Sequence, residues 1–161
     1  MRKAKPMERF LSVDPGIDFG WAMWGKGKPP ILTGVETAPA GKEYHQRADR
    51  TMAAFNQLLE RLEPELVICE WPSLMTGERG GVTVRSGSLV KLAFIVGRMA
   101  EATTLRHIRF ELVAVNTWKG QLSKSVVEYH LNHILGKEVM STIQSHAIDA
   151  TGIGLWYRKL Y

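Results

Sequence analysis

The chain has 161 residues, of which 45% are apolar and 23% are charged. This length suits one globular domain and leaves no room for the two lobes of a kinase or an actin-like ATPase, while the composition excludes a disordered or membrane-embedded chain. Lys and Arg outnumber Asp and Glu by 21 to 16, and the net charge of +5 favours a polyanionic partner such as nucleic acid.

The N-terminal segment and the cysteine usage indicate where the protein works. Residues 1–8 form a basic extension, and the apolar stretch behind it breaks at Asp14, too soon for a signal peptide or a spanning helix. Cys69 is the single cysteine and lies in an apolar run, so we expect a buried thiol rather than a disulfide or a nucleophile. We therefore expect a cytoplasmic protein, located in the bacterial host cytoplasm if a phage encodes it.

Three short apolar runs open the chain. Residues 9–13 end in an Asp-Pro-Gly turn, residues 19–24 end in the turn-forming segment GKGKPP, and residues 31–37 follow. Short connections between strands favour antiparallel pairing. The segment therefore predicts an antiparallel meander of three strands.

Beyond this meander, helical and strand-like spacing alternate. Residues 42–62 and 88–105 show helical spacing, whereas residues 66–69 form a continuous apolar run typical of a strand covered on both faces. Residues 110–115 predict a fifth strand, followed by helices over 125–135 and 141–160. Ser141 and Gln144 have capping-box spacing for the last helix, and Ser145 is an equally good cap.

This order of elements predicts an α/β fold with a five-stranded mixed sheet flanked by helices. Because no repeat, low-complexity tract or linker interrupts it, we expect a single domain over residues 1–161. A Gly- and Arg-rich loop covers residues 76–87. Arg79 and Arg85 in this loop, with Lys91 at the start of the next helix, are candidate phosphate contacts, and a solvated loop without a role is the alternative.

Three acidic residues stand out against apolar surroundings. Asp14 ends the first strand, Glu70 ends the fourth, and Asp149 lies in the last helix three positions after His146, on the same helical face. If the first and fourth strands are neighbours, Asp14 and Glu70 lie side by side within reach of the other two. Clustered carboxylates favour divalent cations, and a pair of such ions supports phosphodiester hydrolysis, with His146 binding the second ion or holding the water.

Each of these residues also has a simpler explanation. Asp-Pro-Gly is a common turn, and Glu70 before Trp71 can be a solvated strand end. A His and an Asp in one helical turn are often a surface or capping pair. Their joint placement at the ends of facing elements favours the catalytic interpretation.

The segments around the acidic residues resemble the RuvC family of Holliday junction resolvases, particularly its compact phage members. The resemblance rests on LSVDPGIDFGW at 11–21, LVICEWP at 66–72 and HAIDATGIG at 146–154, whose spacing matches over almost the whole chain. It implies a ribonuclease H-like fold, a homodimer and a site that binds two Mg²⁺ or Mn²⁺ ions through Asp14, Glu70, Asp149 and His146. In this family the position of His146 is Asp in some members and His in others.

The segment NTWKGQLSKS at 116–125 is similar to a family stretch with two functional lysines. On this match Lys119 and Lys124 contact phosphates near the scissile bond; the alternative is that they are solubilising loop lysines. Many family members carry an aromatic wedge three residues after the glutamate, where this chain has Ser73. Trp71, Leu74 or Met75 are possible substitutes for stacking at the junction centre, and Trp71 is equally compatible with a place in the core.

The resemblance therefore implies a divalent-metal-dependent endonuclease that resolves Holliday junctions by paired hydrolysis, during recombination, repair or phage DNA processing. It implies four-way or branched DNA as partner, with no membrane and no small-molecule cofactor. Paired cuts require two sites, so a second copy is expected to pack against the helix over 88–105, for which core burial is the competing explanation. The alternatives are a broad branched-DNA nuclease, a ribonuclease H, or a non-catalytic nucleic-acid-binding module of this fold.

Overall fold

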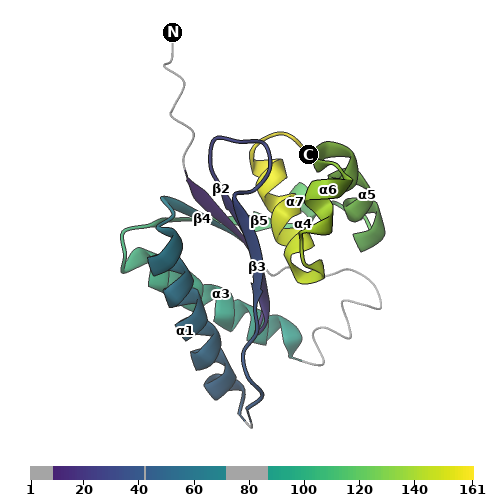
Figure 1. Ribbon diagram of the computed structural model, residues 1–161. Helices are drawn as coiled ribbons and strands as arrows, with labels where there is room; N and C mark the ends of the chain where they lie inside the picture. The colour runs from purple at the N-terminus through teal and green to yellow at the C-terminus, as the bar shows by residue number, and fades with distance from the viewer. Residues whose placement is uncertain (1–8, 42, 72–86) are drawn as a thin grey trace.

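The computed structural model describes residues 9–41, 43–71 and 87–161. Its centre is a five-stranded sheet with the order β3-β2-β1-β4-β5 (Figure 1). The strands are β1 (Phe10–Asp14), β2 (Phe19–Trp24), β3 (Leu32–Glu36), β4 (Leu66–Trp71) and β5 (Arg109–Ala114). β1, β2 and β3 pair antiparallel, while β4 runs parallel to both β1 and β5. The predicted meander and the mixed five-stranded sheet are confirmed.

Helices cover both faces of this sheet. The helices α1 (Tyr44–Leu62) and α3 (Ser88–Thr104) lie on one face. The other face carries α4 (Val115–Trp118), α5 (Lys124–Leu135), α6 (Lys137–Ser141), the 3₁₀ turn η1 (Ser145–Ala147) and α7 (Ile148–Tyr157). Within the described residues, no helix combines the length and the apolar character needed to span a membrane.

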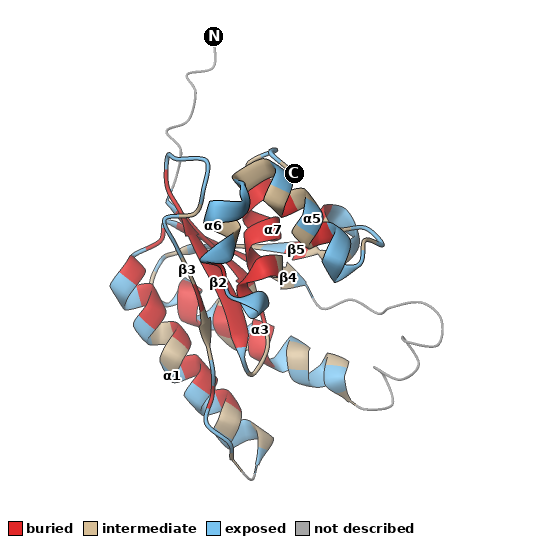
Figure 2. Ribbon diagram, turned by 45° about the vertical axis from the view of Figure 1, so that its right-hand side comes forward, coloured by how far each residue is buried: buried red, intermediate tan, exposed pale blue. Residues whose placement is uncertain are grey.

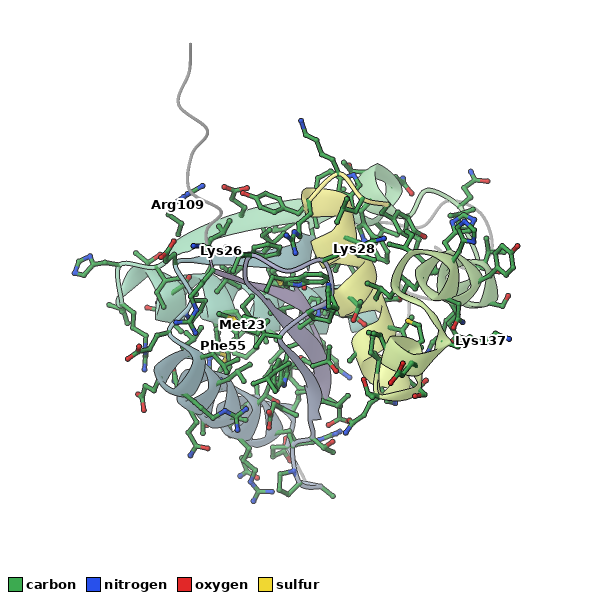
Figure 3. The ribbon with its side chains drawn as sticks, turned by 45° about the horizontal axis from the view of Figure 1, so that its top comes forward. Met23, Lys26, Lys28, Phe55, Arg109 and Lys137 are labelled. Atoms are coloured by element: carbon green, nitrogen blue, oxygen red, sulfur yellow. The ribbon has the colours of Figure 1, made fainter. Side chains whose placement is uncertain are left out.

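Each face of the sheet has its own apolar core, because side chains alternate along a strand. On β1, Leu11 and Val13 join the core beneath α1 and α3, whereas Phe10 joins the core beneath α7. Figure 2 shows buried residues on both sides of the sheet. In Figure 3, Met23 and Phe55, which belong to the same core, lie in the interior, while Lys137 points outward. The same alternation directs Ser12 and Asp14, the other even-numbered positions of β1, toward the face covered by α7.

The predicted closing helix exists as α7, but its predicted bounds of 141–160 are wrong. α6 ends at Ser141, whose hydroxyl donates to the carbonyl of Glu138 at 2.6 Å, and the chain then turns through η1 before α7 begins at Ile148. Neither η1 nor α7 has a side-chain cap, so the proposed capping roles of Ser141 and Ser145 are also wrong. The turn has no Gly or Pro to mark it. The short helix α4 was likewise not predicted.

Candidate active site

Two of the predicted acidic residues lie at the ends of neighbouring parallel strands. Phe10 pairs with Leu66 and Val13 pairs with Cys69, so Asp14 and Glu70 follow at the same edge of the sheet. Both residues occupy the even-numbered positions of their strands, which face the core beneath α7. The expected adjacency of the first and fourth strands is confirmed. Cys69 is fully buried, as expected, in the core beneath α1 and α3 on the other face of the sheet.

A buried hydrogen-bond network brings the third acidic residue to this edge. The Ser12 hydroxyl donates to the carbonyl oxygen of Ala150 at 2.6 Å and accepts from the indole N–H of Trp24 at 2.8 Å. Ser12 lies two residues before Asp14 on β1, and Ala150 directly follows Asp149 in the first turn of α7. The network therefore fixes Asp149 relative to the strand that carries Asp14.

The three carboxylates form one electrostatic cluster. Burial, together with the charges of Glu70 and Asp149, raises the pKa of Asp14 to about 8, although Lys119 and Lys124 partly oppose the rise. Burial also raises the pKa of Glu70, and a hydrogen bond from a tryptophan side chain partly offsets this rise. A cluster of partly buried carboxylates favours a bound cation, because each negative charge opposes ionisation of the others.

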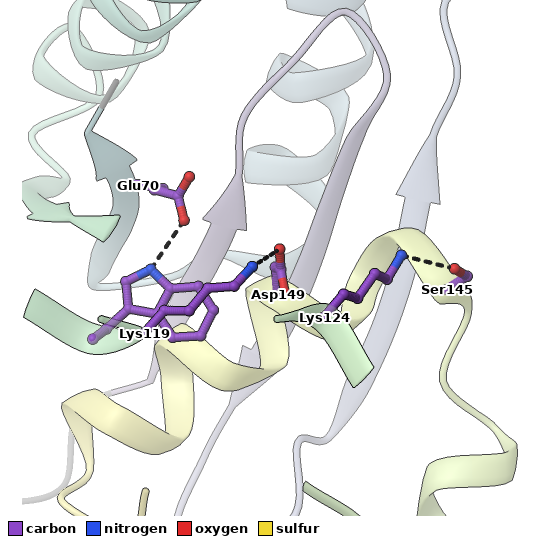
Figure 4. A network of polar contacts seen from close by, with 6 residues as sticks. Glu70, Lys119, Lys124, Ser145 and Asp149 are labelled. Atoms are coloured by element: carbon purple, nitrogen blue, oxygen red, sulfur yellow. Dashed lines mark hydrogen bonds and ion pairs between the residues drawn. The ribbon is translucent and has the colours of Figure 1, made fainter. Parts of the chain in front are cut away.

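Two consecutive residues at the C-terminal end of α4, Trp118 and Lys119, each contact one of these carboxylates (Figure 4). The Trp118 indole N–H donates to Glu70 Oε2 at 2.9 Å, and the Lys119 ammonium lies 2.9 Å from Asp149 Oδ2. Lys124, at the start of α5, donates to Ser145 Oγ at 3.0 Å. The two lysines predicted from the sequence therefore lie at the acidic cluster or beside the turn that leads into α7.

His146 lies in η1 with an exposed side chain, and its backbone approaches the sheet very closely. A Cβ atom built on Gly20 would lie only 1.8 Å from the His146 carbonyl oxygen. Gly20 is the residue that pairs with Asp14 across the β1–β2 ladder. The absence of a side chain at Gly20 therefore lets η1 lie against the strand position opposite Asp14.

The donor set of this site fits a hard divalent cation, which prefers oxygen ligands. Asp149 Oδ1 is buried and has no hydrogen-bond partner within the described part of the chain. Among residues 9–41, 43–71 and 87–161, however, no three His, Cys, Asp or Glu side chains form a ready-made metal site. Lys119 pairs with Asp149 in this arrangement, so binding of a cation requires Asp149 to turn from Lys119 toward the other carboxylates.

The predicted DNA-contacting residues have different outcomes. Trp71 is 45% exposed at the end of β4, so it does not belong to the core. Lys91 is exposed on α3, with its ammonium 5.5 Å from the centre of the Tyr44 ring. The other two candidate phosphate contacts, Arg79 and Arg85, lie outside the described residues. So do Ser73, at the position of the wedge in related resolvases, and its possible substitutes Leu74 and Met75.

Sequence reasoning missed the residues that support the acidic ones. Nothing in the sequence marked Trp118 as part of the site except its place next to Lys119. Gly20 and Gly152 were weakly marked, because a glycine inside an apolar strand or helix often indicates the close approach of another backbone or ring. Gly152 accommodates the Trp118 ring, since a Cβ atom there would lie 2.5 Å from Trp118 Cζ3.

Comparison with solved structures finds this fold in Holliday junction resolvases. RuvC from Thermus thermophilus, solved in complex with a Holliday junction substrate, is 20% identical with a TM-score of 0.68, and the match covers 93% of this chain and 95% of that protein. The yeast mitochondrial resolvase Ydc2 is 15% identical with a TM-score of 0.63, covering 99% and 82%. The fowlpox virus resolvase with junction DNA is 13% identical with a TM-score of 0.55, covering 94% and 99%.

No family model and no curated protein sequence matches the chain. The structural matches confirm the predicted α/β fold, a five-stranded mixed sheet flanked by helices that this chain shares with these resolvases.

Proposed function

We propose that this protein is a divalent-metal-dependent, structure-specific endonuclease that resolves Holliday junctions by paired phosphodiester hydrolysis. The observation that carries this proposal is the convergence of Asp14, Glu70 and Asp149 from β1, β4 and α7 at one edge of the sheet. Partly buried carboxylates that lie close together cost stability, so a fold that holds three of them together favours a functional explanation. The solved resolvases of the same fold include two in complex with junction DNA, which supports branched DNA as substrate.

The cluster would hold Mg²⁺ or Mn²⁺ through Asp14, Glu70, Asp149 and His146. Two such ions supply an activated water and stabilise the departing 3′-oxygen. Lys119 and Lys124 bring positive charge to the same edge, where they would bind and orient the scissile phosphate. The contact of Lys119 with Asp149 at 2.9 Å and that of Lys124 with Ser145 Oγ at 3.0 Å support this role.

Trp71 is the described residue best placed to contact an unstacked base. It directly follows Glu70 on β4, and nearly half of its side chain is exposed. An exposed indole offers a flat surface on which any base can stack. We propose that it takes part of the role that an aromatic wedge has in related resolvases.

The test measures cleavage of four labelled substrates in Mg²⁺, Mn²⁺ or EDTA: a four-way junction, a flap, a linear duplex and an RNA/DNA hybrid. We expect symmetric paired nicks in the junction, and we expect EDTA to abolish them. Asp14→Asn and Asp149→Asn should each lower the cleavage rate at least about 100-fold, because both remove a charge on which cation binding depends. Junction affinity in EDTA should survive in both variants.

Asp49→Asn is the matched control, because Asp49 is an exposed carboxylate on α1 that pairs with Arg98 at 2.8 Å. This variant should cleave at the wild-type rate. Equal cleavage of linear duplex would replace the proposal with a general nuclease, and preferred cleavage of the hybrid would replace it with a ribonuclease H. Full activity of Asp14→Asn would exclude catalysis at this cluster.

A further inference from the structure

Trp118 is a buried residue whose only polar atom contacts the acidic cluster. Its side chain is 3% exposed, and its indole N–H donates to Glu70 Oε2 at 2.9 Å. A tryptophan N–H is a neutral donor that cannot accept a hydrogen bond and does not titrate. The contact therefore orients the Glu70 carboxylate without competing for it as a cation would.

The surroundings of Trp118 fix the direction of this N–H. Gly152 of α7 leaves the space that the indole ring fills, since a Cβ atom there would come within 2.5 Å of Trp118 Cζ3. On another side the ring contacts Tyr161, with ring centroids 6.1 Å apart. A ring packed in this way has little freedom to rotate, so the donor is held in place before any ligand arrives.

The next residue in the chain acts on a different carboxylate. Lys119 pairs with Asp149 at 2.9 Å, so α4 and the residue after it contact acidic groups on both β4 and α7. The two contacts differ in kind. Lys119 supplies a charge that an incoming cation would replace, whereas the neutral Trp118 N–H can stay on Glu70 Oε2 and leave the other carboxylate oxygen to the cation.

We propose that Trp118 is a positioning residue that orients Glu70 for divalent-cation binding. This inference rests on the proposed function, and it adds a residue to the site that acts through Glu70 without touching the substrate. Hydrogen bonds to metal-binding carboxylates fix their orientation, and loss of such a bond typically costs about 10- to 100-fold in metal affinity. Trp118 is therefore expected to control how tightly the site holds its cation.

The decisive variant is Trp118→Phe, which keeps an aromatic ring against Gly152 and removes the N–H. Trp21→Phe is a closely matched control: Trp21 is 4% exposed, and its indole N–H donates to Glu36 Oε1 at 3.1 Å. Its ring also fills the space left by a glycine, Gly34, where a Cβ atom would lie 2.6 Å from Trp21 Cζ2. Trp21, however, faces the core on the opposite side of the sheet from Glu70.

The first measurement is Mn²⁺ binding by titration calorimetry without DNA. Trp118→Phe should raise the Kd for Mn²⁺ about 10-fold or more, whereas Trp21→Phe should leave it within about twofold. In junction cleavage, Trp118→Phe should raise the half-saturating Mn²⁺ concentration by the same factor, with the maximal rate recovering within a few-fold at saturating Mn²⁺. A purely structural role would lower the maximal rate or the melting temperature and leave the metal dependence unchanged.

If Trp118→Phe does not fold, benzothienylalanine at position 118 replaces the N–H with sulfur at nearly equal volume and tests the same bond. Wild-type Mn²⁺ affinity in a folded protein without this N–H would overturn the inference and leave the proposed function intact. Failure of the proposed function is a separate outcome. In that case wild type and Asp14→Asn would show the same weak Mn²⁺ binding, and neither would cleave the junction.

Discussion

At the scale of single residues, Asp14 carries a carboxyl group that the fold keeps from ionising. Burial and the neighbouring charges of Glu70 and Asp149 raise the pKa of Asp14 from 3.8 to about 8. The folded chain therefore retains a proton over a pH range in which the unfolded chain has lost it. The free energy of unfolding must then fall as the pH rises through that range, because the native state binds more protons than the unfolded state.

We expect urea unfolding in EDTA to show that the free energy of unfolding falls between about pH 4 and pH 8, by at most about 1.4 kcal/mol per pH unit. Asp14→Asn should flatten the slope, because the amide does not titrate. Asp49→Asn should keep the wild-type slope. Addition of Mg²⁺ at pH 8 should restore stability in the wild type more than in Asp14→Asn, and identical slopes for wild type and Asp14→Asn would contradict the assigned burial of this carboxyl.

At the scale of elements, the site depends on how closely η1 and α7 approach the sheet. Gly20 on β2 lies beneath the His146 carbonyl oxygen, where a Cβ atom would be separated from it by only 1.8 Å. Backbone atoms cannot move aside as the end of a flexible side chain can. An alanine at this position must therefore displace η1, and with it the start of α7 and Asp149.

We expect Gly20→Ala to lower the free energy of unfolding by roughly 1–3 kcal/mol, as overpacking does, and to reduce Mn²⁺ affinity and cleavage as well. Gly34→Ala is the control, because a Cβ atom there meets the Trp21 ring, away from the acidic cluster. It should lower stability with little effect on Mn²⁺ affinity. Unchanged Mn²⁺ binding by Gly20→Ala would show that the position of η1 does not govern the site.

The sequence predicted elements well where local patterns determined them. Apolar spacing and turn residues were enough for the meander, α1 and α3, and strand-end acids were enough to suggest that Asp14 and Glu70 meet. The break between α6 and α7 was missed because it depends on packing of η1 against Gly20, which is 126 positions from His146 in the chain. The bond from Trp118 to Glu70 joins residues 48 positions apart and has no local signal.

At the scale of the whole molecule, α3 is core in one part and leaves apolar side chains exposed in another. Its C-terminal half is core, with Ile95, Val96 and Met99 buried beneath the sheet. In its N-terminal half, Val90 is 72% exposed and Phe94 is 46% exposed. Apolar side chains exposed together on one helix favour a protein partner. If the protein makes the proposed paired cuts in a nearly twofold junction, that partner would be a second copy of this chain.

We expect the protein to sediment at twice its monomer mass of 18.1 kDa, and Val90→Asp to sediment as a monomer. Leu105→Asp is the control, because Leu105 is equally exposed, at 73%, but lies about 22 Å away at the other end of α3. On a supercoiled plasmid with an extruded cruciform, a dimer cuts both strands and gives linear DNA. Val90→Asp should instead accumulate nicked circles, since each monomer cuts independently, and a wild-type monomer or a dimeric Val90→Asp would contradict the assignment of this face.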